Sequence, residues 1–426
     1  MIFKKKTTKK RPLQMLNDYR VEFFNRLKGI DKITLILVAL LFGIGVIMVY
    51  SITSISDYNG VKNDPSNFFV KTLIMGAAGL VAMLFIIALP YQFLKRMSVV
   101  AVFACPLLLL ATVLFADGSE HSDVNSWFKI GGFKLQPSEF VKIGMIMAVA
   151  WLVDMRVKKR TYYLPTYKGI NLKITYDSFI FILGYIGICT ILVLVQPDFG
   201  SALIIGFIGL IMFLATGVSW KIFKPIFFLG IILLIVGFIG MATLFPYQLE
   251  RFAVWSDPFN HEKGFQNVMG YTAIALGGMM GVGVGNSTQK YGYVVEPHND
   301  MISTILAEEL GVWMVLAVMA MYFIIAMRCF YTAIKSKDIY AALIAVGVGS
   351  IFLVQPFINL GGASGAIPLT GVTLPFICYG GSSLVSLLIG MGIYFNITME
   401  VVSQQKKARI KKQESIRQKV VPFPKS

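Results

Sequence analysis

Glu296, His298 and Asp300 lie close together in the chain, directly before an apolar run that itself contains Glu308 and Glu309. Carboxylates and imidazoles are the side chains that most often transfer protons in enzymes. At the boundary of an apolar region a carboxylate is partly desolvated, which raises its pKa toward the range of an effective general base. We predict that Asp300 is such a base. An Asp before a helix is also a common N-cap, so that alternative stays open.

The amino-acid composition indicates the class of protein in which these groups lie. Hydrophobic residues make up 56% of the 426 residues and charged residues only 14%, with a mean hydropathy of +0.71. In soluble domains charged residues are about a quarter of the chain. The sequence therefore predicts an integral membrane protein. It shows no period-2 alternation of the kind that a membrane barrel needs, so the spans are expected to be helices.

The apolar runs predict an all-α, multi-pass fold. A helix needs about 20 predominantly apolar residues to cross the hydrocarbon core. Ten segments qualify: 33–53, 71–90, 98–115, 138–154, 177–195, 201–217, 223–245, 302–327, 339–360 and 382–401. They form one membrane domain over 33–401, between a basic arm (1–32) and a basic tail (402–426). The long loop 246–301 separates the seventh span from the eighth, and its Gly-rich run 267–285 predicts an interfacial or half-embedded helix that ends at glycines.

The basic residues predict the orientation. If alternate loops lie on the same side, 31 of the 39 Lys and Arg residues fall on the side of the two termini. By the positive-inside rule both termini are cytoplasmic and the loop 246–301 is extracytoplasmic. The basic arm and tail are expected to attract anionic membrane lipids. Nucleic-acid binding is not expected, because no fold or aromatic surface for it is present.

Four motifs on the predicted outer face are similar to those of a known family. They are "WFKIGGFKLQPSEFVK" (127–142), "QPDFGSA" (196–202), "GNSTQKYGYVVEPHNDMISTILAEELG" (285–311) and "GAIPLTGVTLPFICYGGSS" (365–383). In this order they resemble the SEDS family of shape, elongation, division and sporulation proteins. The segment "GNSTQKYGY" resembles the FtsW-like division branch more than the RodA-like elongation branch.

The resemblance implies a ten-helix peptidoglycan glycosyltransferase that polymerises lipid II at the outer face of the bacterial cytoplasmic membrane, at the division septum. Its implied partners are a class B penicillin-binding protein and other divisome proteins. A lipid II flippase and an elongation polymerase are the alternatives. The family's essential acidic residue matches Asp300, although Glu296 and Pro297 are exchanged relative to the family pattern and Asn299 replaces a threonine, which leaves the contacts of Glu296 and Asn299 open.

Other residues are predicted to bind substrate or to support the site. Cations on the outer side suit the phosphates of lipid II, with Arg251 favoured over Lys290 and Lys134 because guanidinium binds phosphate in a bidentate manner. Glu296, His298, Asp198 and Ser382 are further candidates for substrate contact. Helix capping is the alternative for Asp198 and Ser382, and His298 either assists Asp300 or faces water. A divalent cation, Mg²⁺ or Mn²⁺, is an optional bridge to pyrophosphate, and no ligand set for it is predicted.

The supporting residues are polar groups within or beside predicted spans. For Glu308 and Glu309 a structural network with Arg or Lys is favoured over substrate contact. Glu139 and Lys142 are expected to form an i to i+3 ion pair. Asn359 and Gln136 complete the predicted set, and for Asn359 lining of the headgroup site and interhelical hydrogen bonding both remain open.

Overall fold

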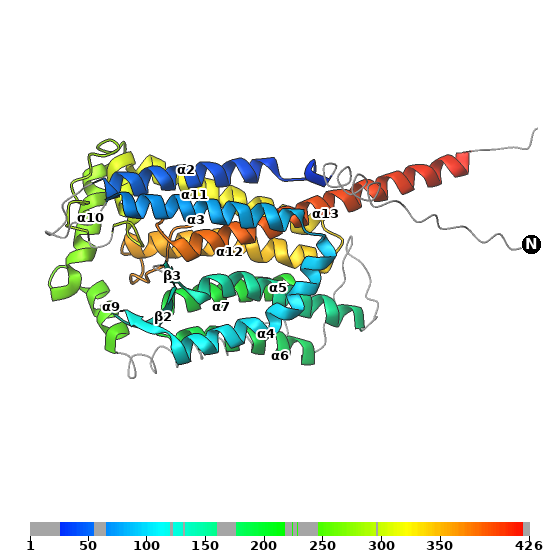
Figure 1. Cartoon of the computed structure of the whole chain (residues 1–426), viewed down its shortest axis with the longest axis horizontal. Coiled ribbons are helices and arrows are strands. Elements are labelled where there is room, and N and C mark those ends of the chain that lie inside the picture. Colours follow the sequence, from blue (N-terminus) through cyan, green and yellow to red (C-terminus); the bar gives the residue numbers. More distant parts are fainter. Residues whose placement is uncertain are drawn as a thin grey trace, which may run out of the picture.

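The computed structural model describes residues 26–54, 65–119, 122–130, 133–159, 176–217, 224, 228, 246–294 and 297–420. These residues form a bundle of long helices with shorter elements gathered at one end (Figure 1). The bundle helices are α2 (Lys32–Thr53), α3 (Pro65–Ala88), α4 (Tyr91–Phe115), α5 (Pro137–Lys159), α6 (Tyr176–Leu194), α7 (Phe199–Ala215), α11 (Ile302–Lys335), α12 (Ile339–Ala363) and α13 (Gly381–Val420).

Six helices in the described part of the chain, α2, α3, α4, α11, α12 and α13, are long and apolar enough to cross a membrane. Shorter apolar helices occupy 180–194 and 199–215, within α6 and α7. The predicted span 138–154 coincides with α5, whose Glu139, Lys142 and Asp154 are buried inside the bundle, as ionisable groups within a span should be. The predicted span 223–245 lies outside the described residues apart from Lys224 and Phe228.

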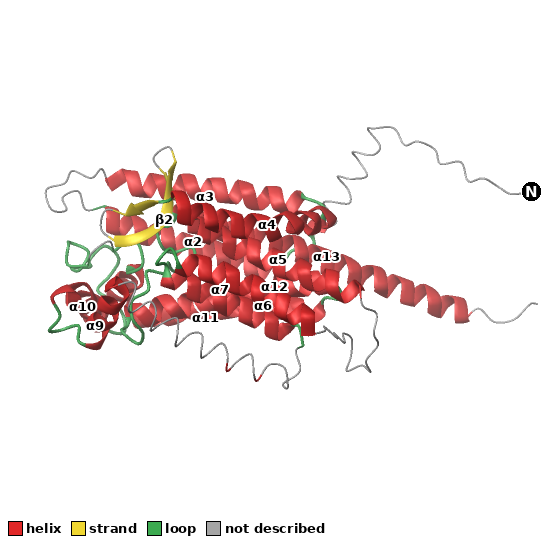
Figure 2. Cartoon of the chain, turned by 90° about the horizontal axis from the view of Figure 1, so that it is seen from below, coloured by secondary structure: helices red, strands yellow, loops and turns green. Residues whose placement is uncertain are grey.

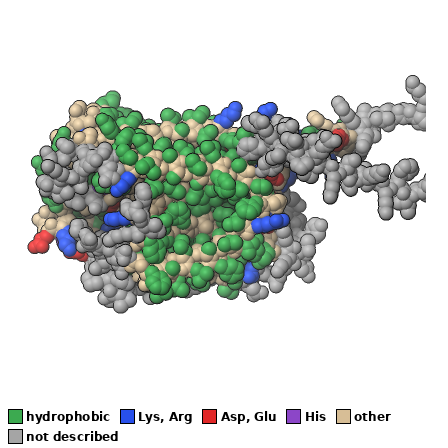
Figure 3. All heavy atoms as spheres, viewed as in Figure 1, with side chains coloured by type: hydrophobic (Ala, Val, Ile, Leu, Met, Phe, Trp, Pro, Cys, Tyr) green, Lys and Arg blue, Asp and Glu red, His purple; other side chains and the backbone are tan. Residues whose placement is uncertain are grey.

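The outer surface of the bundle suits a lipid environment. Large apolar side chains on α3 and α4 face outward, with Val81 67%, Phe103 68% and Leu107 63% exposed. Hydrophobic side chains cover much of the face in Figure 3. Apolar patches of this extent are rare on soluble monomers and are typical of surfaces that contact lipid.

Two ends of the bundle differ. At the first, called here the loop end, lie short strands between α4 and α5, α9 (Pro246–Ser256), η1 (Glu262–Gly264), α10 (Phe265–Gly277) and the connection 364–380 between α12 and α13 (Figures 1 and 2). At the other end, the tail end, α13 continues well beyond the bundle. The predicted Gly-terminated helix in the long loop is confirmed as α10, whose C-cap is Gly278 at φ 52°.

A small antiparallel sheet corrects the all-α expectation. The strands β1 (Asp117–Ser119), β2 (Ser122–Ile130) and β3 (Phe133–Leu135) pair in the order β1-β2-β3. Ile130 pairs with Phe133, and the two residues between them in the sequence are glycines, a pair typical of two-residue hairpins. No long apolar run marks these strands in the sequence. The "FKIGGFKL" pattern, with its central glycine pair, does indicate a hairpin between β2 and β3.

The helix α11 is broken at Gly311, where φ is 79° and ψ is 170°. The segment 278–283, which follows α10, fills the break with backbone hydrogen bonds in both directions. The amides of Val282 and Gly283 donate to the carbonyls of Glu308 and Glu309 at 2.9 Å, and those of Val312 and Trp313 donate to Gly278 and Met279 at 3.0 and 3.4 Å. The break therefore leaves these backbone groups hydrogen-bonded, including the carbonyls of the buried Glu308 and Glu309, as a helix interruption in an apolar bundle requires.

We expect Gly311→Ala to destabilise the protein by roughly 1–3 kcal/mol, because a Cβ at this positive φ is strained. The same Cβ would lie 2.4 Å from the Met279 carbonyl oxygen, which belongs to the inserted segment. Thermal unfolding in detergent measures the effect. Gly187→Ala in α6 is the matched control, since a Cβ there meets nothing within 4 Å and Ala favours the helix. Equal stability of both variants would contradict the expected strain.

Candidate active site

Asp300 lies at the loop end, in the turn that leads into α11. His298, Asn299 and Asp300 are half-buried, and Pro297 is buried. The N-cap residue of α11 is Met301, which makes no side-chain capping bond. The backbone carbonyl of Asp300 accepts a hydrogen bond from Asn359 Nδ2 at 2.8 Å. Glu296 lies outside the described residues, so its predicted role keeps the status of a prediction.

A five-residue segment of the α12–α13 connection, 369–373, brings several of the predicted residues together. Arg251 Nη1, from α9, donates to the Leu369 carbonyl at 2.8 Å. Asn359 Nδ2, from α12, donates both to the Val372 carbonyl at 2.7 Å and to the Asp300 carbonyl. Arg251 is therefore bonded directly to this segment, and the Asp300 backbone is linked to it through Asn359, although the three residues are far apart in the sequence.

The start of α7 packs against the same segment. A Cβ on Gly200 would lie 2.5 Å from the Thr370 carbonyl oxygen, so only glycine permits this approach. Asp198 is the N-cap of α7, because its Oδ1 accepts from the Ser201 amide at 3.0 Å, and its Oδ2 accepts from Gln136 Nε2 at 2.9 Å. Burial raises the pKa of Asp198. The capping alternative is thus confirmed, and substrate contact by Asp198 stays a prediction.

Ser382 joins α13 to the third strand. Its hydroxyl donates to the Lys134 carbonyl and accepts from the Gln136 amide, both at 3.0 Å. The Lys134 side chain is exposed. Ser382 therefore fixes the backbone that carries Lys134 and Gln136 at the edge of the site.

The expected pair of Glu139 and Lys142 is confirmed. Lys142 Nζ donates to Glu139 Oε1 at 2.9 Å, and both side chains are nearly fully buried in α5. Lys142 Nζ also donates to Gln355 Oε1 at 3.2 Å, and Gln355 Nε2 donates to the Thr373 carbonyl at 2.9 Å. The ion pair is therefore joined to the 369–373 segment through Gln355.

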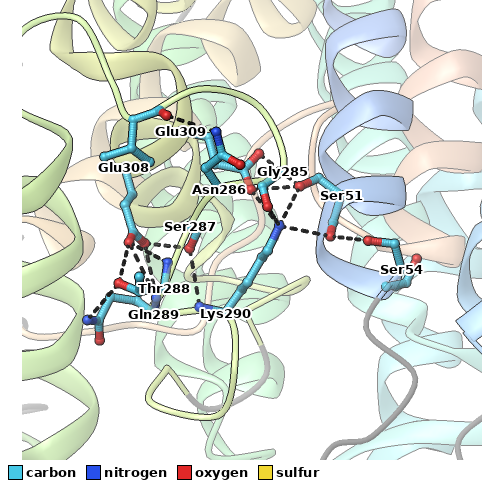
Figure 4. Close-up of polar contacts among 12 residues, drawn as sticks. Ser51, Ser54, Gly285, Asn286, Ser287, Thr288, Gln289, Lys290, Glu308 and Glu309 are labelled. Atoms are coloured by element: carbon cyan, nitrogen blue, oxygen red, sulfur yellow. Dashed lines mark hydrogen bonds and ion pairs between the residues drawn. The ribbon is translucent and has the colours of Figure 1, made fainter.

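Glu309 forms the predicted structural network with a lysine, whereas Glu308 is bound by neutral donors (Figure 4). Glu309 pairs with Lys290 at 2.9 Å and accepts from the Ser51 hydroxyl at 2.7 Å. Within the described ranges Glu308 has no cation among its hydrogen-bond partners; it accepts from the Ser287 hydroxyl and from the amides of Thr288 and Gln289. Both carboxylates thus anchor the stretch 287–290.

The position of Lys290 does not fit its predicted role as a phosphate ligand. The residue is only 3% exposed. Besides Glu309, its ammonium group donates to the Ser51 hydroxyl at 3.0 Å and to the Gly285 carbonyl at 2.8 Å. An ammonium group has three protons, and these partners use all of them. Lys290 is therefore a structural residue in this arrangement.

His298 lies in a cluster of aromatic rings. Its ring centroid is 4.7 Å from that of Phe68 and 5.6 Å from that of Tyr379, and the Tyr379 amide donates to the His298 carbonyl at 2.9 Å. These contacts position the turn before Asp300. No pattern in the sequence indicated that Phe68 at the start of α3 takes part, because the contact joins residues about 230 positions apart.

The arrangement suits chemistry that transfers a proton and releases an anion. It combines a half-buried carboxylate, Asp300, with a guanidinium group, Arg251, at the edge of an apolar bundle where charges act strongly. Within the described ranges no group of three or more His, Cys, Asp or Glu side chains lies close enough together to hold a metal ion. A divalent cation held by only one or two protein carboxylates takes its other ligands from water and substrate phosphates, as Mg²⁺ often does.

Comparisons with known proteins cover nearly all of this chain. A family model for FtsW, RodA and SpoVE, described as "Cell cycle protein", matches residues 31–403. A Bacillus subtilis protein named "Probable peptidoglycan glycosyltransferase FtsW" is 38% identical, over 90% of this chain and 94% of the relative. Stage V sporulation protein E of the same organism is 33% identical, over 86% and 96%.

Solved structures support the fold. A structure described as "Structural coordination of polymerization and crosslinking by a peptidoglycan synthase complex" matches with a TM-score of 0.69 and 24% identity, over 87% of this chain and 98% of the matched chain. The rod shape determining protein RodA of Thermus thermophilus matches with a TM-score of 0.60 and 22% identity, over 87% and 96%. At these identities the likeness concerns the fold alone.

Proposed function

Because the chain belongs to the FtsW/RodA/SpoVE family of cell cycle proteins, we propose that it is a peptidoglycan glycosyltransferase that polymerises lipid II into glycan strands. The observation that carries this proposal is the convergence of Asp300 and Arg251 on the 369–373 segment. Glycosyl transfer from a pyrophosphate donor requires a base and a cation at the same site.

In this reaction Asp300 is the general base. The acceptor hydroxyl oxygen forms a bond to the donor sugar, the bond from that sugar to pyrophosphate breaks, and the hydroxyl proton passes to the Asp300 carboxylate. Half-burial beside an apolar bundle favours this role, because partial desolvation makes a carboxylate a better proton acceptor. If a divalent cation takes part, it would supply charge neutralisation at the pyrophosphate.

Arg251 holds the pyrophosphate of the donor. Its Nη1 donates to the carbonyl of Leu369, in the segment that Asn359 links to the Asp300 backbone. Guanidinium binds phosphate oxygens in a bidentate manner and stays charged as the leaving group departs. Lys134, exposed on β3, is a second cation available at this end of the bundle.

The loop end faces outward in this proposal, and both termini are cytoplasmic. Ten spans, including 223–245, produce this topology, and the distribution of Lys and Arg supports it. The exposed basic helix 406–412 at the tail end then lies on the cytoplasmic side, together with anionic lipid headgroups.

Partners and location follow from the same assignment. A class B penicillin-binding protein would crosslink the glycan product, and the FtsW names of several relatives favour action with other divisome proteins at the septum. One solved structure with a similar fold is described as coordinating polymerisation with crosslinking, which is the kind of partnership proposed here.

Polymerisation of labelled lipid II by the purified protein, together with its cognate class B penicillin-binding protein, tests the function. Glycan chains are the expected product. If no polymer forms but labelled lipid II crosses the bilayer of reconstituted vesicles, the chain is a transporter. If neither occurs, it is a scaffold that recruits the transpeptidase.

Arg251→Ala is expected to weaken transfer by about 10- to 100-fold in kcat/KM, the size of a lost hydrogen bond to a charged group. Arg251→Lys should recover part of this loss, since it keeps the charge but not the two-pronged geometry. Initial rates at several lipid II concentrations measure both. Lys263→Ala is the matched control, because Lys263 is a loop-end cation that pairs with Glu250 and is 67% exposed. An equal effect of both substitutions would assign Arg251 only a general electrostatic role.

A further inference from the structure

Two buried amide side chains on α12, Gln355 and Asn359, lie one helical turn apart and face the same side. They are 0% and 3% exposed. Their amide nitrogens bind consecutive carbonyls of the 369–373 segment, Gln355 that of Thr373 and Asn359 that of Val372. The helix α12 therefore holds this segment through two adjacent points.

The two amide nitrogens differ in what they connect, because Gln355 Nε2 donates to two oxygens of Thr373 alone, whereas Asn359 Nδ2 joins two separate segments. Its Nδ2 group donates one proton to the Val372 carbonyl at 2.7 Å and the other to the Asp300 carbonyl at 2.8 Å. This fixes the orientation of the amide, because the flipped form would set Oδ1 against two carbonyl oxygens. Only a side chain with two donors on one atom can make this bridge.

The oxygen of the same amide indicates that Asn359 makes its hydrogen bonds through its nitrogen. Asn359 Oδ1 is buried and has no hydrogen-bond partner in the described part of the chain. A buried acceptor without a partner costs about 1–3 kcal/mol. Asn359 thus contributes to the arrangement through its two donors alone, and these join Asp300 to the segment that also binds Arg251.

We propose that Asn359 is a positioning residue for Asp300. By holding the Asp300 and Val372 carbonyls together, it sets the distance and angle between the Asp300 carboxylate and the 369–373 segment, along which the donor pyrophosphate lies. Asn359 does not touch substrate in this scheme; it acts through the backbone of Asp300. The inference rests on the proposed function, in which Asp300 is the base.

Two substitutions separate positioning from packing. Asn359→Asp keeps the shape but replaces the donors with acceptors, and Asn359→Leu keeps a similar volume without any polar group. In both, kcat for lipid II polymerisation is expected to fall by about 10- to 100-fold with little change in KM, because a shift of about 1 Å in a reacting group costs this much. Ser350→Ala is the matched control on α12, since Ser350 is buried and donates to the Val346 carbonyl in its own helix.

The readouts are kcat, KM and thermal unfolding in detergent, all on the full chain with its partner. A purely structural Asn359 would lower the unfolding temperature and leave kcat per folded molecule unchanged, which would overturn the proposal. If Asn359→Leu fails to fold, the isosteric Asn359→Asp decides by the same criterion. Wild-type protein that makes no glycan would instead refute the proposed function itself, and active wild type with inactive Asp300→Asn but unimpaired Asn359 variants would refute only the positioning role.

Discussion

Asp300→Asn is expected to abolish measurable polymerisation of lipid II by lowering kcat about 10²- to 10⁴-fold, the usual contribution of a positioned general base. The amide has nearly the same shape as the carboxylate but cannot accept the proton of the attacking hydroxyl. The fold should survive, because the Asp300 carbonyl that bonds to Asn359 is unchanged and Met301 is the N-cap residue of α11. Glycan chain length on gels, with labelled lipid II, measures the effect.

Asp257→Asn provides the matched control for this experiment. Asp257 is an exposed acid in the turn after α9, where it accepts hydrogen bonds from Asn260. The substitution removes the same charge from the same end of the bundle, and full activity is expected. If Asp300→Asn polymerises as well as wild type, the base must be sought first at Glu296, since donors already bind the carboxylates of Glu308 and Asp198.

The helices of the bundle could be predicted from the sequence, whereas the details of the loop end could not. Runs of about 20 apolar residues predict a span by length alone, so α2, α4, α11, α12 and α13 fall where hydropathy puts them. The break in α11 could not be predicted from hydropathy. Gly311 permits a positive φ, but the inserted partner segment 278–283 is fixed by close contact between Gly281 and Gly311, which no periodic pattern encodes.

The candidate site shows the same division between local and distant contacts. Glu139 with Lys142 and Asp198 with Ser201 are three residues apart, and helix geometry alone predicts such pairs. The demand of a buried carboxylate for a partner was also predictable in general. The identity of that partner could not be predicted, because Glu309 bonds to Ser51, 258 residues earlier in the chain, and pairs with Lys290. The charge of Lys290 alone suggests a phosphate ligand instead.

Lys290→Met is expected to destabilise the protein by about 3–5 kcal/mol, since it leaves the Glu309 carboxylate buried without a cation. The two side chains are 1% and 0% exposed, so water cannot replace the lost partner. The segment 287–290 would also lose one of its two anchors on α11, the other being Glu308 (Figure 4). Unfolding in detergent, followed by helical circular dichroism, measures the loss.

A double-mutant cycle with Glu309→Gln decides whether the pair itself is responsible. The double variant carries no buried charge at this pair, and the amide introduced by Glu309→Gln would still be able to bond to Ser51, so we expect it to be more stable than Lys290→Met alone. The pair of Lys263 and Glu250 at the same end is the matched control, because its side chains are 67% and 32% exposed and an exposed pair contributes about 0–1 kcal/mol. Equal losses of stability from breaking the two pairs would show that burial does not strengthen the Lys290–Glu309 pair. They would also show that the network around Glu309 does not hold the loop that leads to Asp300.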